Sequence, residues 1–244
     1  AAIVGLVRPR VAPPAQAAFG FTPYGPLNNN ATTDKGQDYS PVVATDGAGT
    51  WITVWESNGT AGSAIGNEGD VFYAVSTDNG MTWSDPETLN TNATTDSMQD
   101  PEPVIASDGN GHWITVWASQ ENLGGAIGID WDILYAVSSD DGATWSDPAA
   151  LNTNASVDSN SDLSPDVASD KNGHWVVVWH TFDTLGGTIG SDGDIVVARS
   201  TNNGTTWTAP VALNTNAASD TGMDGPACIV SDSVGAWLAA WEVR

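Results

Sequence analysis

Trp-Ile-Thr-Val-Trp at residues 51–55 is the clearest repeated segment of this chain. It returns as Trp-Ile-Thr-Val-Trp at 113–117, as Trp-Val-Val-Val-Trp at 175–179 and as Trp-Leu-Ala-Ala-Trp at 237–241, so each copy begins 62 residues after the previous one. Repetition at a constant period predicts a protein built from several copies of one structural unit.

Each unit contains four short segments with the pattern of a β-strand. In the first unit these are Pro41–Thr45, residues 51–55, Val71–Val75 and a segment that ends at Leu89, separated by turns rich in Gly and Asp. Apolar residues do not recur at helical spacing. The second and third strands are apolar on both faces, and stacking of units around an axis would cover both faces. We therefore predict an all-β protein, a β-propeller of 62-residue four-stranded blades.

The repeat predicts a single domain over residues 1–244. Its complete units cover about 41–102, 103–164 and 165–226. The last unit holds only two strands, and Phe21–Leu27 is in register with a fourth strand, while Ala2–Val7 could supply a third. We predict four blades, one of them shared between residues 1–40 and 227–244. Two alternatives remain open: the chain is a fragment of a larger propeller, or it completes its ring by pairing with a second copy.

A second motif, Ser-x-Asp-x-Gly-x-Thr-Trp, follows the third strand of each complete unit. It covers residues 76–83, 138–145 and 200–207, and Asn202 takes the place of the aspartate in the third copy. The Asp side chain accepts backbone N–H groups of its turn and Gly supplies a positive φ, which predicts a structural turn and not a reactive site. The residues with this predicted structural role are Ser76, Asp78, Gly80, Thr82, Trp83, Ser138, Asp140, Gly142, Thr144, Trp145, Ser200, Asn202, Gly204, Thr206 and Trp207.

With three copies of this motif in register, the chain resembles the Asp-box proteins with bacterial neuraminidase (BNR) repeats, which include the sialidases. The resemblance covers about residues 20–244 and implies a β-propeller with each box between the third and fourth strands of a blade. Sialidases use three arginines, a Tyr–Glu pair and an acid/base Asp on a six-bladed propeller. The four arginines of this chain, Arg8, Arg10, Arg199 and Arg244, do not match that pattern, so we assign no catalytic residue.

Acidic residues also repeat in the loops that join successive units. The pairs are Asp34/Asp38, Asp96/Asp100, Asp158/Asp162 and Asp220/Asp224. In a four-bladed ring the second members, Asp38, Asp100, Asp162 and Asp224, would approach the axis and repel one another. Because a hard cation with oxygen ligands would relieve this repulsion, we predict Ca²⁺ at these four residues. The alternative is that they form Asx turns that face water.

Trp131 lies outside the regular tryptophan pattern, in a Gly- and Asp-rich loop. An indole in such a loop is suited to stack on a sugar or on a partner protein, which makes Trp131 a candidate ligand-binding residue. The alternative is that it packs on its own loop.

Composition limits the function. The formal net charge is −24, which excludes nucleic acid as a partner, and no apolar run is long enough to span a membrane. The single cysteine excludes an internal disulfide, and the Asp-, Asn- and Thr-rich composition favours a secreted or cell-surface protein. Near-perfect repetition without a catalytic cluster in any one unit predicts a non-catalytic module that binds glycans or surface proteins, or that is structural. The alternatives are a sialidase-type exo-glycosidase and a homo-oligomer that assembles through the split blade.

Overall fold

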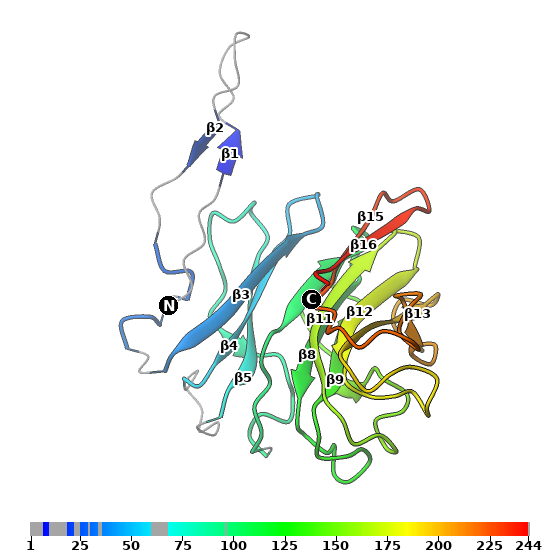
Figure 1. Ribbon diagram of the computed structural model, residues 1–244. Helices are drawn as coiled ribbons and strands as arrows, with labels where there is room; N and C mark the ends of the chain where they lie inside the picture. Colours follow the sequence, from blue (N-terminus) through cyan, green and yellow to red (C-terminus); the bar gives the residue numbers. More distant parts are fainter. Residues whose placement is uncertain are drawn as a thin grey trace.

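The computed structural model describes residues 25–28, 30–33, 36–59, 68–95 and 97–243, and the backbone of 7–9 and 19–21. Every regular element within these ranges is a β-strand (Figure 1), and none of them is a helix that could cross a membrane. The strands are β1 (Val7–Pro9), β2 (Phe19–Phe21), β3 (Asp38–Thr45), β4 (Trp51–Ser57), β5 (Asp70–Ser76), β6 (Glu87–Thr88), β7 (Val104–Ser107), β8 (Trp113–Ser119), β9 (Asp132–Ser138), β10 (Ala149–Ala150), β11 (Asp162–Ser169), β12 (Trp175–Thr181), β13 (Asp194–Ser200), β14 (Val211–Ala212), β15 (Cys228–Ser231) and β16 (Trp237–Ala240).

Three antiparallel four-stranded sheets carry the strands in chain order. They are blade one (β3–β6), blade two (β7–β10) and blade three (β11–β14), and they are followed by a half-blade of β15 and β16. Within blade one, β4 pairs with β5 without interruption from Trp51 opposite Ser76 to Ser57 opposite Asp70. The β-branched and aromatic residues of the second and third strands favour these long central strands. The predicted all-β propeller fold of four-stranded units is confirmed.

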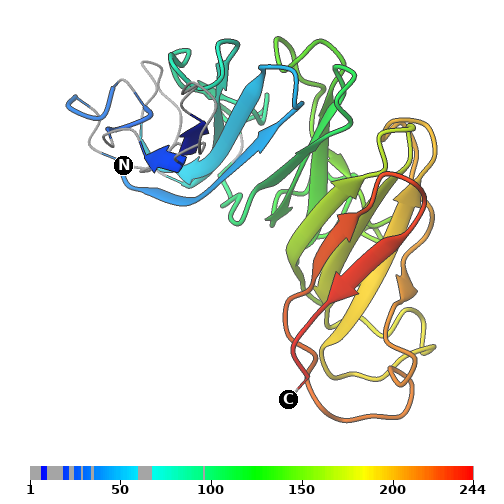
Figure 2. The same ribbon diagram turned by 90° about the horizontal axis from the view of Figure 1, so that it is seen from above.

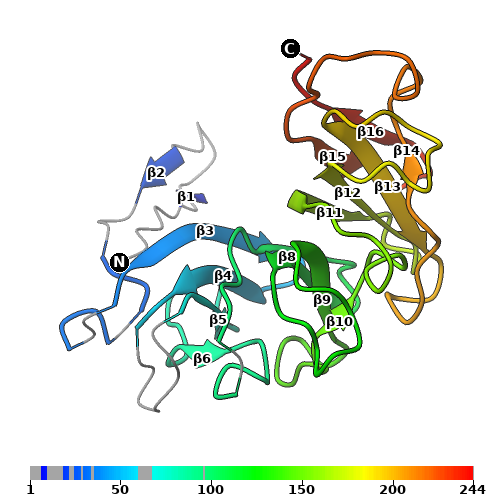
Figure 3. The same cartoon turned by 60° about the horizontal axis from the view of Figure 1, so that its bottom comes forward.

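The blades follow one another along an arc. Figure 3 shows the first strands β3 and β11 on the inner side of this arc and the short fourth strands β6, β10 and β14 on its outer side. Figure 2 shows the same order from above, from the blue N-terminal sheet to the red half-blade. Each blade therefore presents its first strand to a common axis, as in a propeller.

The core lies between neighbouring blades. Ile52 of β4 packs in one cluster with Trp113 and Trp117 of β8. Ile114 of β8 packs in the next cluster with Trp175 of β12. All five side chains are fully buried. Because burial of one large apolar side chain contributes roughly 1.5–3 kcal/mol, these repeated contacts between blades are a major source of stability.

The two ends of the arc differ from the predicted shared blade. Phe21 and Leu27 were expected in one fourth strand, but Phe21 ends β2, which pairs with β1. Leu27 is buried against Trp55 and Phe72 of blade one, so its apolar side chain is covered without joining the half-blade. Residues 1–6 and 22–24 lie outside the described residues, and a blade shared with residues 227–244 stays a prediction.

The half-blade exposes one apolar face. Val230 and Leu238 are register partners on β15 and β16, and they are 58% and 68% exposed. Ile52 and Ile114, at the position equivalent to Leu238 in blades one and two, are each covered by tryptophans of the following blade. The Leu238 face is thus the face on which a further blade would stack.

Candidate functional site

The first Asp box is a closed hydrogen-bonded turn. Oδ1 of Asp78 accepts the backbone N–H groups of Met81 and Thr82, both at 2.8 Å, and Oδ2 accepts the Thr82 hydroxyl at 2.8 Å. Ser76 donates its hydroxyl to Asp78 at 2.9 Å. These bonds, first of all that from the Thr82 backbone, lower the pKa of Asp78 to about 2. Since both oxygens are engaged within the turn, this carboxylate is placed to hold the hairpin and not to meet a substrate.

The third Asp box keeps the same turn with an amide. Oδ1 of Asn202 accepts the Thr206 backbone N–H at 3.0 Å, and Nδ2 donates to the Thr206 hydroxyl at 2.9 Å. The hydroxyl of Thr206 thus changes from donor to acceptor, which explains why asparagine is tolerated here.

The Asp boxes also fasten each blade to the preceding one. Trp145 of the second box meets Tyr73 of blade one edge-on, with ring centroids 5.9 Å apart. Trp207 of the third box meets Tyr135 of blade two in the same way, at 5.7 Å. The aromatic residue of each of these boxes therefore contributes to the packing between blades, as edge-to-face pairs do.

Acidic clusters lie among the loops at the ends of the strands opposite to the Asp boxes. In blade two, Nδ2 of Asn152 donates to Asp132 at 2.7 Å and to Asp162 at 2.9 Å, while its Oδ1 accepts the Ile133 backbone N–H at 3.1 Å. Asp132 and Asp162 are almost fully buried. In blade three, Asn214 donates to Asp194 at 2.8 Å in the equivalent position.

Further acids complete the cluster in each of these blades. Carboxylate oxygens of Asp130, Asp132 and Asp158 lie within 4.8 Å of one another, and so do those of the equivalent blade-three residues, Asp192, Asp194 and Asp220. All six ligand atoms are oxygens, which are the donors that hard cations such as Ca²⁺ prefer.

Burial disfavours the charged form of these acids. It is the largest cause that raises the pKa of Asp132 to about 7, against the hydrogen bond from Asn152. Burial also raises the pKa of Asp158 to about 6, followed by repulsion from Asp130 and Asp183. Asp162, for which burial is again the main cause, has a pKa well above its ordinary range. These clusters therefore gather several carboxyl groups in a poorly solvated place that disfavours their negative charge.

The four acids predicted as a calcium ring are distributed one to each unit. Asp38 and Asp100 accept hydrogen bonds from Asn28 at 3.0 Å and Asn90 at 2.8 Å, as Asp162 does from Asn152. Asp224 is buried and its backbone N–H donates to Gly193 at 2.8 Å. Among the described residues no metal-spaced group contains two of the four, so the structure does not bring them together, and a calcium site that they share stays a prediction.

The first strands enclose a groove of about 350 Å³ along the axis. Its two acids reach from one blade to the next. Glu102 accepts the backbone N–H and the hydroxyl of Ser164, both at 3.0 Å, and Asp166 accepts the Ile229 backbone N–H at 2.7 Å. Both carboxylates thus act as clasps between neighbouring blades. The groove is lined by Ser40, Pro41, Val42, Glu102, Pro103, Val104, Ser164, Pro165, Asp166, Pro226, Ala227 and Cys228.

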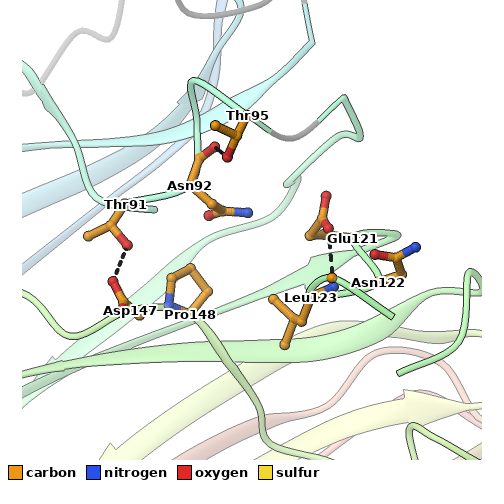
Figure 4. Close-up of a pocket in the computed structure, with 9 residues that line it drawn as sticks. Thr91, Asn92, Thr95, Glu121, Asn122, Leu123, Asp147 and Pro148 are labelled. Atoms are coloured by element: carbon orange, nitrogen blue, oxygen red, sulfur yellow. Dashed lines mark hydrogen bonds between the residues drawn. The ribbon is translucent and has the colours of Figure 1, made fainter. Parts of the chain in front are cut away.

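A larger pocket of about 630 Å³ lies between blades one and two (Figure 4). Its lining combines hydroxyl, amide and carboxylate groups: Thr91, Asn92, Thr95, Glu121, Asn122, Leu123, Gly124, Asp147 and Pro148. The Thr91 hydroxyl donates to Asp147 at 2.6 Å, and Glu121 accepts the Leu123 backbone N–H at 3.1 Å. Oδ1 of Asn92 is buried without a hydrogen-bond partner.

This pocket was not predicted from the sequence, although one position of the repeat varies where the pocket lies. Position 121 differs in each complete unit, with Gly59 in blade one and Asp183 in blade three. In blade three, Asp183 accepts a hydrogen bond from Asn154 at 3.1 Å, which occupies the amide. The substitution of Glu121 for this aspartate accompanies the open pocket in blade two.

The other predicted candidates lie elsewhere. Trp131 is half-buried and packs on the core cluster between blades two and three, as do Leu185 and Ile189. Its contact with a ligand stays a prediction. Arg199 is exposed on β13, while Arg10 and Arg244 lie outside the described residues.

The family that the sequence matches is the one that the Asp-box motif indicates. Residues 31–232 match the family of BNR repeat-like domains. No curated protein sequence matches the chain.

Several solved structures have the same fold. A Hadza microbial sialidase has a TM-score of 0.54 and 17% identity over 85% of this chain and 46% of its own. An α-L-arabinanase from Penicillium chrysogenum, complexed with arabinobiose, has a TM-score of 0.57 and 15% identity over 83% of this chain and 58% of its own. An endo-arabinase from Bacteroides thetaiotaomicron has a TM-score of 0.53 and 17% identity over 92% of this chain and 77% of its own. The chain thus spans about half of the first two structures, and the likeness concerns the fold.

Proposed function

Because this chain belongs to the family of BNR repeat-like domains, we propose that it is a secreted, non-catalytic propeller that binds neutral glycans. One observation carries the proposal: the pocket of about 630 Å³ between blades one and two. Its threonine hydroxyls, asparagine amides and the carboxylates of Glu121 and Asp147 are the groups that hydrogen-bond sugar hydroxyls. The fold is that of glycan-processing propellers, which supports a glycan-related function.

The two carboxylates of the groove formed by the first strands, Glu102 and Asp166, support a binding role without catalysis. A glycosidase needs a pair of carboxyl groups free to act on the scissile bond. Glu102 and Asp166 instead accept hydrogen bonds from the next blade, at 2.7–3.0 Å. Carboxylates engaged in this way join neighbouring blades, which favours a structural role for both residues.

Charge favours a neutral ligand over a sialic acid. The formal net charge is −24, and the pocket contains two carboxyl side chains, which would repel an anionic sugar. Recognition of a carboxylate sugar uses guanidinium groups, and Arg199 lies on the exposed surface of β13, outside the pocket lining.

Binding is tested with arabinobiose, a neutral disaccharide, against a sialylated trisaccharide, by calorimetry and product analysis in the same samples. We expect the protein to bind arabinobiose and to release no cleavage product. Thr91→Ala and Asp147→Asn should each weaken binding about tenfold, as loss of one or two hydrogen bonds does. The matched controls are Thr153→Ala and Asp85→Asn, which make the same changes one blade away. Equal weakening by the controls would exclude this pocket, and preference for the sialylated sugar would exclude the proposed ligand class.

A second candidate is a glycoside hydrolase, because one acid breaks the repeat near the axis. Glu56 stands where the other complete blades have Ala118 and His180. Burial raises its pKa, and the charge of Glu102 raises it further. A carboxyl group with a raised pKa beside a second carboxylate is the arrangement of a general acid. Release of product that is abolished by Glu56→Gln would establish this candidate in place of the first.

A further inference from the structure

The acidic clusters of blades two and three have a feature that charge alone does not explain. Asp132 and Asp194 are buried to 1% and 0% exposure, yet Oδ2 of each has no hydrogen-bond partner. The other oxygen of each accepts a bond from Asn152 or Asn214. A buried, unpartnered carboxylate oxygen is unfavourable unless a hydrogen-bond donor or a cation neutralises it.

These orphaned oxygens belong to the triads within which carboxylate oxygens lie no more than 4.8 Å apart. Oδ2 of Asp130 and Oδ1 of Asp158 are also buried without a partner in blade two. The same holds for Oδ2 of Asp192 and Oδ1 of Asp220 in blade three. In each blade, three carboxylates thus converge with one unpartnered oxygen apiece.

The backbone is shaped to admit one of these carboxylates. A Cβ on Gly128 would lie 2.3 Å from Oδ1 of Asp130, and a Cβ on Gly190 would lie 2.3 Å from Oδ1 of Asp192. Gly128 also donates its N–H to the Ala155 carbonyl at 2.9 Å, which ties the two loops that carry Asp130 and Asp158. A larger residue at either glycine would require the aspartate side chain to shift.

We propose that blades two and three each bind one Ca²⁺ ion, through Asp130, Asp132 and Asp158 in blade two and Asp192, Asp194 and Asp220 in blade three. Ca²⁺ takes six to eight oxygen ligands at about 2.3–2.6 Å, so carboxylate oxygens less than 5 Å apart fit around one ion. A set of carboxylates without His or Cys favours this hard cation over zinc. These sites differ from the predicted ring of Asp38, Asp100, Asp162 and Asp224, because each lies within one blade.

The role of such an ion is to join loops. Asp130 and Asp132 precede and begin β9, whereas Asp158 lies in the loop that leads to β11 of the next blade. An ion held by both loops would fix the connection between blades two and three. The equivalent residues of blade one are Glu68, Asp70 and Asp96, and Asp96 lies outside the described residues, so the inference concerns blades two and three.

The test is calorimetric titration of the chelator-treated protein with CaCl₂, up to a few millimolar, which exceeds the ~0.1–1 mM dissociation constants of extracellular calcium modules. We expect two equivalents for the unmodified protein. Asp130→Asn/Asp158→Asn should leave one, and so should Asp192→Asn/Asp220→Asn. Asp141→Asn is the matched control, because Asp141 is a remote carboxylate at a position where blades one and three carry asparagine, and it should leave both equivalents.

Thermal melting gives a second readout that does not depend on enthalpy of binding. Each double variant removes repulsion, so in chelator it should melt above the unmodified protein. In calcium it should show a smaller rise in melting temperature than the unmodified protein. If a double variant does not fold, Asp158→Asn alone provides the same comparison. Absence of calcium binding, or two equivalents bound by either double variant, would overturn the proposal.

Discussion

A Cβ on Gly142, in the second Asp box, would lie 2.3 Å from Cδ1 of Ile52 in the preceding blade. The same closeness recurs one blade later, where a Cβ on Gly204 would lie 2.5 Å from Cδ1 of Ile114. The glycine of each of these boxes therefore serves two purposes, a positive φ for the turn and room for the isoleucine of its neighbour.

Gly142→Ala should lower the free energy of unfolding more than Gly47→Ala. Both glycines have a positive φ, 80° and 76°, but nothing lies within 4 Å of a Cβ on Gly47. The strain of the backbone is common to the two variants, and the clash with Ile52 adds about 1–3 kcal/mol. Urea denaturation measures both. Equal losses would show that the turn alone requires the glycine.

The Asp boxes should make stability depend on acid. Hydrogen bonds lower the pKa of Asp78 to about 2 and also lower that of Asp140, chiefly through the Thr144 hydroxyl. Their contribution is complete above the unfolded value of about 3.9 and is lost as the pH falls toward 2. Asp78→Asn/Asp140→Asn, which copies the third box, should flatten this decline. Denaturation curves from pH 5 to 2 test it, and an unchanged slope would contradict the role of the boxes.

Leu238 provides a test of ring closure. It occupies the repeat position of Ile114, but Leu238 is 68% exposed and Ile114 is fully buried. Ile114→Ala should lower stability by about 2–5 kcal/mol, whereas Leu238→Ala should change it by less than ~0.5 kcal/mol. A large loss in Leu238→Ala would mean that the half-blade is covered in solution. Mass measurement would then separate a shared blade from a second copy.

Loss of the hydrogen bond between Asp166 and the Ile229 backbone N–H should lower stability and leave glycan binding unchanged. Asp166→Ala removes the acceptor of the Ile229 N–H, which should lower the free energy of unfolding by about 1–3 kcal/mol. Asp166→Asn keeps an acceptor and should lose less. Affinity for arabinobiose should be unchanged in both variants. Loss of arabinobiose binding would place Asp166 in a functional site.

Much of the fold follows from the sequence because the repeat is so regular. Strands over residues 51–55, 113–117 and 175–179 were expected from tryptophan and β-branched residues, and the structure extends each by two residues. Apolar residues on both faces of these strands required stacked blades. The edges of the fold were harder to predict. Leu27 fits the fourth-strand pattern, yet it packs on Trp55 and Phe72, since the nearest apolar surface is blade one.

The sites were less accessible to sequence reasoning. The Asp-x-x-x-Asp spacing drew attention to the loop acids, but spacing does not show that Asn152 binds Asp132 and Asp162 together. Nor does it show that Asp158 approaches Asp130. Such contacts join residues that are 10 to 28 positions apart in the chain, and only the folded blade brings them together. The pocket beside Glu121 likewise depends on two adjacent blades.

The core clusters that each span two adjacent blades have a consequence for how the protein opens. In such arrays the stability of each unit depends on its interfaces with its nearest neighbours. A blade with a neighbour on each side is therefore better protected against local unfolding. In the part of the chain that the structure describes, blade two has a blade on both flanks, whereas the half-blade has one. Backbone amide hydrogens should therefore exchange with solvent fastest in β15 and β16 and slowest in β8, as local openings spread inward from the half-blade end.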